Sequence, residues 1–194
     1  MNEPRNEKGQ TLNEFLAGYD LTKYDRPSVT VDNIVLAHVD SRPAVLLIRR
    51  RNHPFIGCLA FPGGFLEKGE ELEQGAAREL FEETGITGVR PIQLGAYGRP
   101  GRDPRGWIVT VAFIMLLPPG QLPHAGDDAA DAGLYYIEVD RENGFITLTR
   151  TDMSESIEVL YEIEHGRAKF IPNAYVAGDH AQILADALIK LDMI

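Results

Sequence analysis

The sequence of 194 residues carries 19 basic and 29 acidic side chains, a formal net charge of −10, and is long enough for one domain with a sizeable core. Nucleic acid and anionic membranes both repel an acidic body, so the charge argues against both as partners. Cys58 is the single cysteine, which excludes an internal disulfide, and we find no signal peptide and no membrane-length apolar run; together these features predict a cytoplasmic protein.

Strands outnumber helices among the predicted elements. Runs rich in Val and Ile, bounded by turn residues, predict strands at residues 29–39, 44–51, 58–61, 91–97, 107–117, 134–139, 145–149 and 157–163. The last of these could instead be helical. Residues 121–133 are predicted to form an acidic loop. This pattern indicates a mixed sheet flanked by helices.

Helices are predicted at residues 11–16, 71–84 and 180–191. The first begins with Thr11 as a cap and Glu14 three residues later, and it lies in an N-terminal extension of residues 1–28. The second consists of strong helix formers, and Gly85 follows it where a left-handed C-terminal cap belongs.

One face of the helix at 71–84 concentrates negative charge. At about 100° per residue, Glu79, Glu82 and Glu83 fall within roughly 100° of arc, with Glu83 expected on the solvent side. Three such carboxylates repel one another unless a cation lies among them, and hard oxygen ligands select Mg²⁺ or Mn²⁺. Because Mg²⁺ also binds phosphates, it would let an acidic protein hold an anionic substrate. The alternative is a solvated acidic helix with pairs such as Arg78 and Glu82.

The span from Gly64 to Ile86 matches a known signature at every specified position. That signature reads Gly, five residues, Glu, seven residues, Arg-Glu, an aliphatic residue, any residue, Glu-Glu, any residue, Gly and an aliphatic residue. Its positions are occupied here by Gly64, Glu70, Arg78, Glu79, Leu80, Glu82, Glu83, Gly85 and Ile86. The sequence therefore resembles the Nudix hydrolases.

The resemblance implies an α/β fold, the Nudix α/β/α sandwich with a mixed β-sheet, over residues 29–194. Residues 140–170 have no counterpart and are taken as an unplaced insertion. The implied reaction is hydrolysis of a nucleoside diphosphate linked to another moiety.

The resemblance also implies roles for individual residues of the signature. Divalent cations would be bound by Glu79, Glu82 and Glu83 together with the backbone carbonyl of Gly63. Arg78 would orient these carboxylates. The residue at the junction between loop and helix, Glu70, would close that junction.

The general base has several candidates. Glu82 or Glu79 would serve if metal does not occupy all of its oxygens. Some Nudix hydrolases take the base from a loop outside the signature, and the counterpart here contains Asp127, Asp128 and Asp131. A solvated loop is the simpler interpretation of those aspartates.

Two further stretches, residues 99–106 and 177–188, resemble the ADP-ribose pyrophosphatases of this superfamily. In the first, Arg102 and Arg105 would hold a diphosphate in fork geometry; otherwise they serve solubility and pair with Asp103.

Three residues outside the signature have a second interpretation each. Arg50 ends the second predicted strand and is a further candidate for binding phosphate. Trp107 could stack on adenine, although an aromatic residue at the start of a strand belongs more often to the core. His180 begins a helix and is predicted to cap or pack rather than to bind a ligand.

The sequence thus predicts a Mg²⁺- or Mn²⁺-dependent pyrophosphohydrolase of ADP-ribose, with AMP and ribose 5-phosphate as products. The alternatives are a hydrolase of oxidised nucleoside triphosphates, a ligand sensor that controls transcription, and a non-catalytic interaction protein. Such regulators add a winged-helix domain after the closing helix and often lose carboxylates, whereas this sequence stops at Ile194 with its carboxylates intact. The resemblance also implies a homodimer, with residues 11–28 or 145–170 as the contact surface.

Overall fold

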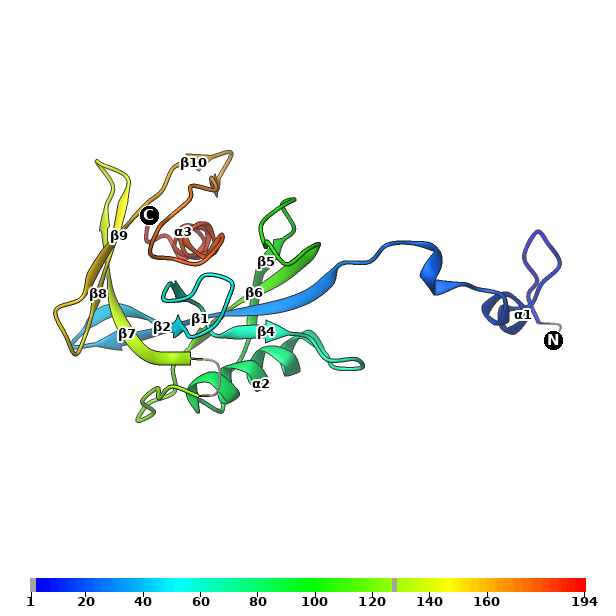
Figure 1. Cartoon of the computed structure of the whole chain (residues 1–194), viewed down its shortest axis with the longest axis horizontal. Helices are drawn as coiled ribbons and strands as arrows, with labels where there is room; N and C mark the ends of the chain where they lie inside the picture. Colours follow the sequence, from blue (N-terminus) through cyan, green and yellow to red (C-terminus); the bar gives the residue numbers. More distant parts are fainter. Residues whose placement is uncertain (1–2, 127–128) are drawn as a thin grey trace.

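The computed structural model describes residues 3–126 and 129–194. A mixed sheet carries one helix on each of its faces (Figure 1). The helices are α1 (Leu12–Ala17), α2 (Leu72–Thr84) and α3 (His180–Lys190), and Leu21–Lys23 form a 3-10 turn. In Figure 1, α2 lies below the sheet and α3 above it.

The strands are β1 (Ser28–Val39), β2 (Arg42–Arg50), β3 (Leu59–Ala60), β4 (Gly63–Phe65), β5 (Ile92–Tyr97), β6 (Ile108–Leu116), β7 (Ala129–Asp140), β8 (Phe145–Arg150), β9 (Ser156–Leu160), β10 (Ile163–Glu164) and β11 (Arg167–Ala168). The main sheet has the order β5-β6-β1-β2-β7-β8-β9, with β3 beside β2 and β4 beside β1. β1 and β6 are parallel, whereas the other neighbours in this sheet are antiparallel. The predicted α/β/α sandwich with a mixed sheet is confirmed.

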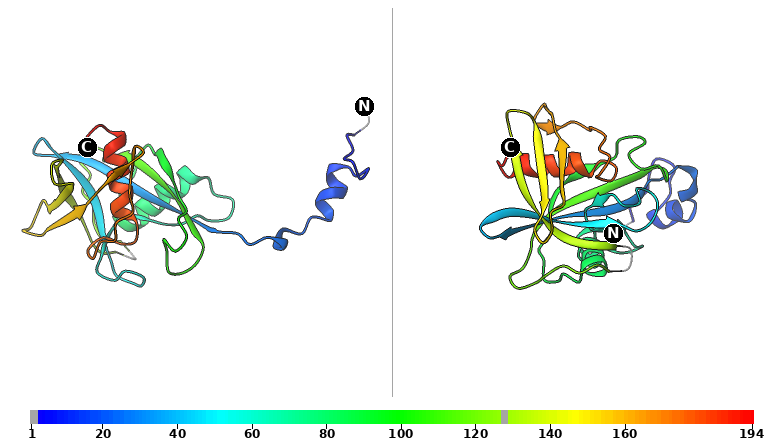
Figure 2. Two further views of the ribbon diagram at one scale, coloured as in Figure 1. Left: turned by 90° about the horizontal axis from the view of Figure 1, so that it is seen from above. Right: turned by 60° about the vertical axis from the view of Figure 1, so that its left-hand side comes forward.

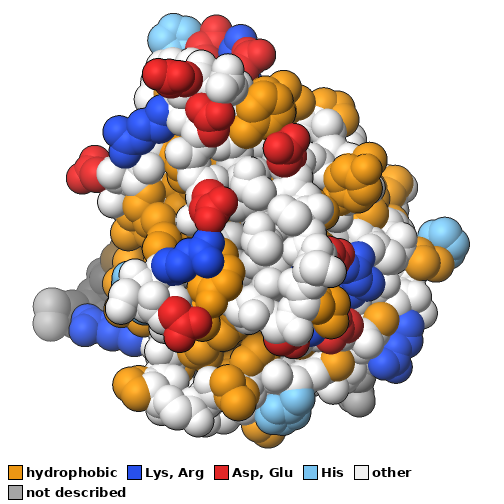
Figure 3. All heavy atoms as spheres, turned by 90° about the vertical axis from the view of Figure 1, so that its left-hand side faces the viewer, with side chains coloured by type: hydrophobic (Ala, Val, Ile, Leu, Met, Phe, Trp, Pro, Cys, Tyr) orange, Lys and Arg blue, Asp and Glu red, His pale blue; other side chains and the backbone are white. Residues whose placement is uncertain are grey.

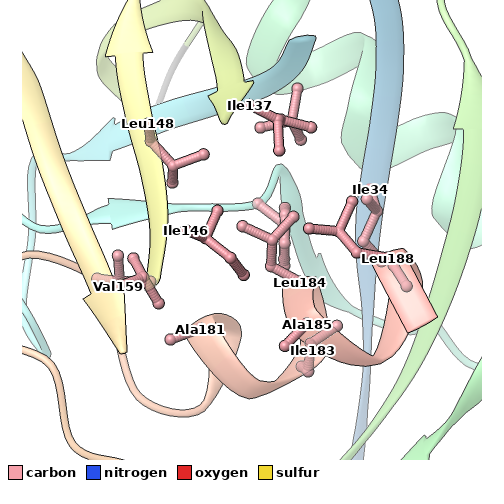
Figure 4. Close-up of a cluster of buried hydrophobic side chains, with 14 of the residues drawn as sticks. Ile34, Ile137, Ile146, Leu148, Val159, Ala181, Ile183, Leu184, Ala185 and Leu188 are labelled. Carbon is pink, nitrogen blue, oxygen red and sulfur yellow. The ribbon is translucent and has the colours of Figure 1, made fainter. Parts of the chain in front are cut away.

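The two faces of the sheet are both apolar, because successive side chains of a strand point to opposite sides. On β1, Ile34 packs under α3 with Leu184 and Leu188 (Figure 4). Its neighbour Val35 belongs to the cluster that contains Leu80 of α2. Helices α2 and α3 therefore each cover one face of the sheet.

Helix α3 is tied to the rest of the fold by its buried Asp186. This carboxylate accepts hydrogen bonds from the Tyr97 hydroxyl at 2.9 Å, the Ala168 amide at 2.7 Å and Arg167 at 3.2 Å. Burial, with the neighbouring Asp186 adding to it, raises the pKa of Tyr97. The end of β5 and the hairpin β10–β11 are thereby joined to α3, which gives its N-terminus a defined position.

The structure differs from the sequence prediction between residues 121 and 170. The predicted loop at 121–133 is wrong from Ala129 onward, because β7 begins there and pairs with β2. That pairing outweighs the low strand propensity of Ala and Asp. Residues 157–160 are extended in β9, not helical. The segment 140–170 thus supplies β8 and β9 to the sheet edge and then the hairpin β10–β11.

The N-terminal segment extends away from the sheet (Figures 1 and 2). Its helix α1 has the predicted capping box, in which Thr11 Oγ1 accepts from the Glu14 amide at 3.2 Å and Glu14 accepts from the Thr11 amide at 2.7 Å. Among the residues that the structure describes, no helix combines the length and the hydropathy needed to cross a membrane.

The C-terminal end of α2 is held by the loop that follows β6. The amides of His124 and Gly126 donate to the carbonyls of Thr84 and Glu83 at 3.1 and 2.9 Å, which satisfies groups that have no partner inside the helix. A Cβ at Gly126 would lie 1.9 Å from the carbonyl oxygen of Glu82. Only glycine allows the loop to approach the helix this closely.

We expect Gly126→Ala to lower the free energy of unfolding by about 1–3 kcal/mol, because the loop must move off backbone atoms that cannot give way. Gly95→Ala is the matched control, since a Cβ there would meet nothing within 4 Å. Urea unfolding of both variants measures the difference. Equal stability of the two variants would contradict the close packing of this loop.

Candidate active site

A cavity of about 600 Å³ opens beside α2. Its walls come from α2, β1, β2 and β4, from the loop before β6, and from the first residues of α3. The three carboxylates predicted on one helix face, Glu79, Glu82 and Glu83, all line it. The structure therefore brings together the predicted acidic cluster and the segments that precede β6 and α3.

Arg78 organises the acidic residues around it. Its guanidinium donates to Glu70 at 2.8 and 3.0 Å, to Glu79 at 2.8 Å, to Glu82 at 3.0 Å and to the carbonyl of Phe65 at 3.0 Å. The hydrogen bonds to Glu70 raise the pKa of Arg78, and the same contacts lower the pKa of Glu70. The positive charge is thus shared among carboxylates that would otherwise repel one another.

Glycine is required where β4 passes α2. The Gly63 amide donates to Glu83 Oε2 at 2.8 Å. A Cβ at Gly63 would lie 2.1 Å from the Val31 carbonyl oxygen, and one at Gly64 would lie 2.4 Å from Glu79 Oε2. The expectation that Glu83 faces solvent is wrong. Glu83 is only 8% exposed, and its carboxylate packs against β4 at Gly63.

The carboxylates differ in their surroundings. The side chain of Glu79 is 14% exposed and that of Glu82 is 50% exposed. Burial raises the pKa of Glu79, and its hydrogen bond from Arg78 opposes that rise. Glu79 and Glu82 therefore lie side by side in different dielectric surroundings.

The chemistry of these donors suits a hard divalent cation, because Glu79, Glu82 and Glu83 line one cavity together with Gly63. Among the described residues, no three His, Cys, Asp or Glu side chains already converge as a metal-binding group. Arg78 instead holds Glu79 and Glu82. Each of these hydrogen bonds uses one carboxylate oxygen, Oε1 of Glu79 and Oε2 of Glu82, so Arg78 leaves the second oxygen of each carboxylate for an ion.

Arg102 is not the solvent-facing loop arginine that the sequence suggests. It donates to both oxygens of Asp179 at 2.8 and 2.7 Å, and its side chain is only 6% exposed. Its second neighbour is Asp32, at 3.8 Å. Burial opposes the charged form, but the bonds to Asp179 outweigh it and raise the pKa of Arg102. This guanidinium fixes the residue that precedes α3.

Arg105 and Arg50 line the same cavity in a different way. Arg105 donates to both oxygens of Asp103 and lies over the Phe65 ring, with 42% of its side chain exposed. Arg50 donates through Nε to the carbonyl of Pro54 at 2.8 Å. Both residues line the cavity, which makes them candidates to bind an anionic ligand.

The remaining residues that the sequence singled out either do not line the cavity or lie outside the part of the chain that the structure describes. Trp107 is 57% exposed, so it is not a core residue, and it does not line the cavity. Asp131 belongs to β7 and pairs with Arg150 instead of lying in a solvated loop. Asp127 and Asp128 lie outside the residues that the structure describes.

Asp32 is a cavity residue that the sequence reasoning missed, and His180 was predicted only to cap or pack. The His180 ring does pack, stacking on Phe61 with centroids 5.2 Å apart, yet it also lines the cavity. A signal for Asp32 was present, since it is a lone acidic residue within an apolar strand. A charge at such a position needs a local reason.

Comparison with known proteins agrees with this geometry. The family model for the NUDIX domain matches residues 27–149. The chain is 44% identical over 119 residues to an ADP-ribose pyrophosphatase of Methanocaldococcus jannaschii. The matched segment covers 60% of this chain and 68% of that protein. It is 40% identical over 105 residues to the ADPR responsive transcriptional repressor NtrR of Acinetobacter baylyi, covering 53% of this chain and 42% of the repressor.

Solved structures give the same assignment. A MutT/nudix family protein from Enterococcus faecalis superposes with a TM-score of 0.78 at 32% identity, over 96% of this chain and 71% of that one. The NUDIX domain of Shewanella oneidensis NrtR, solved with ADP ribose, gives a TM-score of 0.60 at 35% identity, over 66% and 84%. Because the family model matches more than half of the chain, the chain belongs to the Nudix family, and with its signature complete it is a Nudix hydrolase of phosphoric anhydride bonds.

We expect Arg102→Ala and Arg105→Ala to separate stability from substrate binding. Arg102→Ala leaves buried Asp179 without its countercharge and should lower the free energy of unfolding by about 3 kcal/mol. Arg105→Ala removes a half-exposed charge and should leave the melting temperature unchanged, while KM for the nucleotide rises about tenfold and kcat stays constant. Thermal unfolding and steady-state kinetics test both. A destabilised Arg105→Ala would show that this loop arginine is scaffolding.

Proposed function

We propose that this chain is a Mg²⁺- or Mn²⁺-dependent pyrophosphohydrolase that cleaves ADP-ribose to AMP and ribose 5-phosphate. The observation that carries the proposal is the convergence of Glu79, Glu82 and Glu83 with Arg50 and Arg105 on one cavity. Acidic residues for a cation and basic residues for a phosphate are what hydrolysis of an acidic substrate by an acidic protein requires.

The ion would be bound by the three carboxylates and the carbonyl of Gly63. When bound, a divalent cation would supply positive charge that stabilises the negative charge developing as the diphosphate bond breaks, and it would lower the pKa of a bound water. Arg78 keeps Glu79 and Glu82 on the same side of α2. One of these two would accept the proton of the attacking water, and Glu82 is the more exposed.

We propose ADP-ribose as the substrate because of the names of two similar proteins. The archaeal relative carries the name ADP-ribose pyrophosphatase and a neighbouring structure contains ADP ribose. The volume of about 600 Å³ lies within the range of small-molecule sites. Arg105, with part of its guanidinium exposed, is placed to receive a diphosphate oxygen.

A second candidate function is ADP-ribose sensing, which the 40% identity to a transcriptional repressor favours. Both functions need the same ligand, so binding alone does not separate them. The complete set of signature carboxylates supports hydrolysis, since a sensor has no use for a reactive cation site. Turnover of ADP-ribose is therefore the discriminating measurement.

We expect chelation and one substitution to abolish activity without unfolding the protein. Hydrolysis should stop in EDTA and return with Mg²⁺ or Mn²⁺, with Zn²⁺ a poor substitute at an all-oxygen site. Glu82→Gln should lower kcat at least about a hundredfold. Glu73→Gln, an exposed residue near the start of the same helix, is the matched control with normal kcat. Full turnover in excess chelator would refute the metal-dependent reaction.

We expect ADP-ribose to have a higher kcat/KM than dGTP or 8-oxo-dGTP. The reason is that Arg50 and Arg105 line the same cavity as the carboxylates, which suits a diphosphate between two bulky groups. Coupled assays that detect AMP, ribose 5-phosphate and pyrophosphate distinguish the reactions. A preference for a triphosphate with release of pyrophosphate would assign the chain to the other class.

We expect a homodimer, with a mass in light scattering about twice the 21.5 kDa of one chain. The N-terminal segment exposes Leu12, Phe15, Leu16, Tyr19, Leu21 and Tyr24, and such apolar side chains favour burial against a second copy. The end of the molecule that carries β8 and β9 instead mixes charged side chains of both signs with apolar ones (Figure 3).

Two substitutions separate the contact surfaces. Leu16→Asp in α1 should give a monomer, whereas Leu160→Asp in β9 should leave the dimer intact. The opposite result would assign the contact to residues 145–170. A wild-type mass near that of one chain would exclude a stable dimer.

A further inference from the structure

His180 and Asp32 form a donor–acceptor pair on the cavity wall. His180 is the first residue of α3 and Asp32 lies on β1. The Phe61 amide donates to His180 Nδ1 at 2.9 Å. A ring nitrogen that accepts a hydrogen bond carries no proton, so the proton of this imidazole is on Nε2. That N–H group points toward Asp32.

Neither group finds a hydrogen-bond partner in the described part of the chain. Nε2 and Asp32 Oδ1 are 3.7 Å apart, which is too long for a hydrogen bond. Both side chains are largely buried, with 13% and 10% exposed, and both line the cavity. A polar group left unpaired in this way costs free energy, so the pair has hydrogen-bonding capacity that the described residues do not use.

The pair is held rigidly. The His180 ring lies nearly parallel to Phe61, at an interplanar angle of 18°. Asp179, the residue before it, accepts hydrogen bonds from Nε and Nη2 of Arg102. The same guanidinium lies 3.8 Å from Asp32 Oδ2 and supplies a nearby positive charge to that carboxylate. Such preorganisation lowers the entropic cost of binding.

The chemistry of the pair excludes two kinds of ligand. A protonated Nε2 cannot coordinate a metal ion, because its lone pair is used by the proton. A phosphate group would meet the Asp32 carboxylate, and like charges repel. What fits is a neutral group that donates to Asp32 and accepts from His180 on adjacent atoms.

We propose that Asp32 and His180 bind the vicinal hydroxyl groups of a ribose in the substrate. One hydroxyl donates to Asp32 Oδ1, and the oxygen of its neighbour accepts from His180 Nε2. This proposal rests on the proposed function, because it names the part of ADP-ribose that this wall recognises. ADP-ribose has two such riboses, one in adenosine and one at the far end, and the test distinguishes them.

The experiment compares kcat/KM for ADP-ribose and for two analogues, each lacking both the 2- and the 3-hydroxyl of one ribose. Wild-type protein should discriminate against one analogue by about tenfold or more, and that analogue identifies the bound ribose. His180→Phe retains an aromatic ring on Phe61 but has no donor. It loses one of the two proposed contacts, so it should discriminate against that analogue severalfold less than wild-type protein does.

Asp32→Ala removes the other contact and should likewise reduce discrimination against that analogue, which provides a second variant in case His180→Phe does not fold. Arg105→Ala is the matched control from the same cavity, and it should keep the wild-type ratio between substrates. If both pair variants slow all three substrates by one factor, the pair is structural and the proposal is overturned. Equal hydrolysis of the three substrates by wild-type protein also overturns it.

A failure of the proposed function is recognised separately. If wild-type protein does not hydrolyse ADP-ribose, the same three ligands are titrated by calorimetry. Discrimination that is reduced in His180→Phe would then support the ribose contact, although the proposed hydrolysis of ADP-ribose would be refuted. Equal affinities, or no binding, would overturn the ribose contact as well.

Discussion

The arrangement of the site depends on one guanidinium. Arg78 has five N–H donors, and they meet the carboxylates of Glu70, Glu79 and Glu82 and the carbonyl of Phe65. Without this charge, acidic groups crowded on one turn of α2 would repel one another and turn apart. A lysine could not replace it, because an ammonium group has three donors and no fixed fork. Helix α2 therefore carries both the acidic side chains and the arginine that keeps their carboxylates in place.

The second constraint is the close approach of backbone to backbone around α2. β4 passes between β1 and the helix at Gly63 and Gly64, and the loop after β6 closes on the helix end at Gly126. These contacts leave no room for a side chain. They place the Gly63 amide on Glu83 and so bury one acidic residue of a helix face that would otherwise be solvated.

The two loop arginines show how three residues of separation can divide structural from functional roles. Arg102 enters the interior and joins the loop before β6 to the start of α3 through Asp179. Arg105 stays at the cavity rim with its neighbour Asp103. Burial decides between them, because a charge removed from water must be paired within the protein whereas a rim charge stays available to a ligand.

The sequence alone determined the class of fold, the helix α2 with its cap at Gly85, and the residues Glu79, Glu82 and Glu83, because local periodicity and a spaced signature depend only on neighbours along the chain. It could not determine that Ala129 begins a strand, that Glu83 is buried, or that Asp32 and His180 meet across the cavity. Those features arise where separate segments of the chain come into contact: Ala129 pairs with Arg50, Gly63 binds Glu83, and Asp32 lies beside His180. Only the tertiary structure decides such contacts. The pairing of β7 with β2 outweighs local strand propensity. Burial by other elements determines which charged side chains need a partner within the protein.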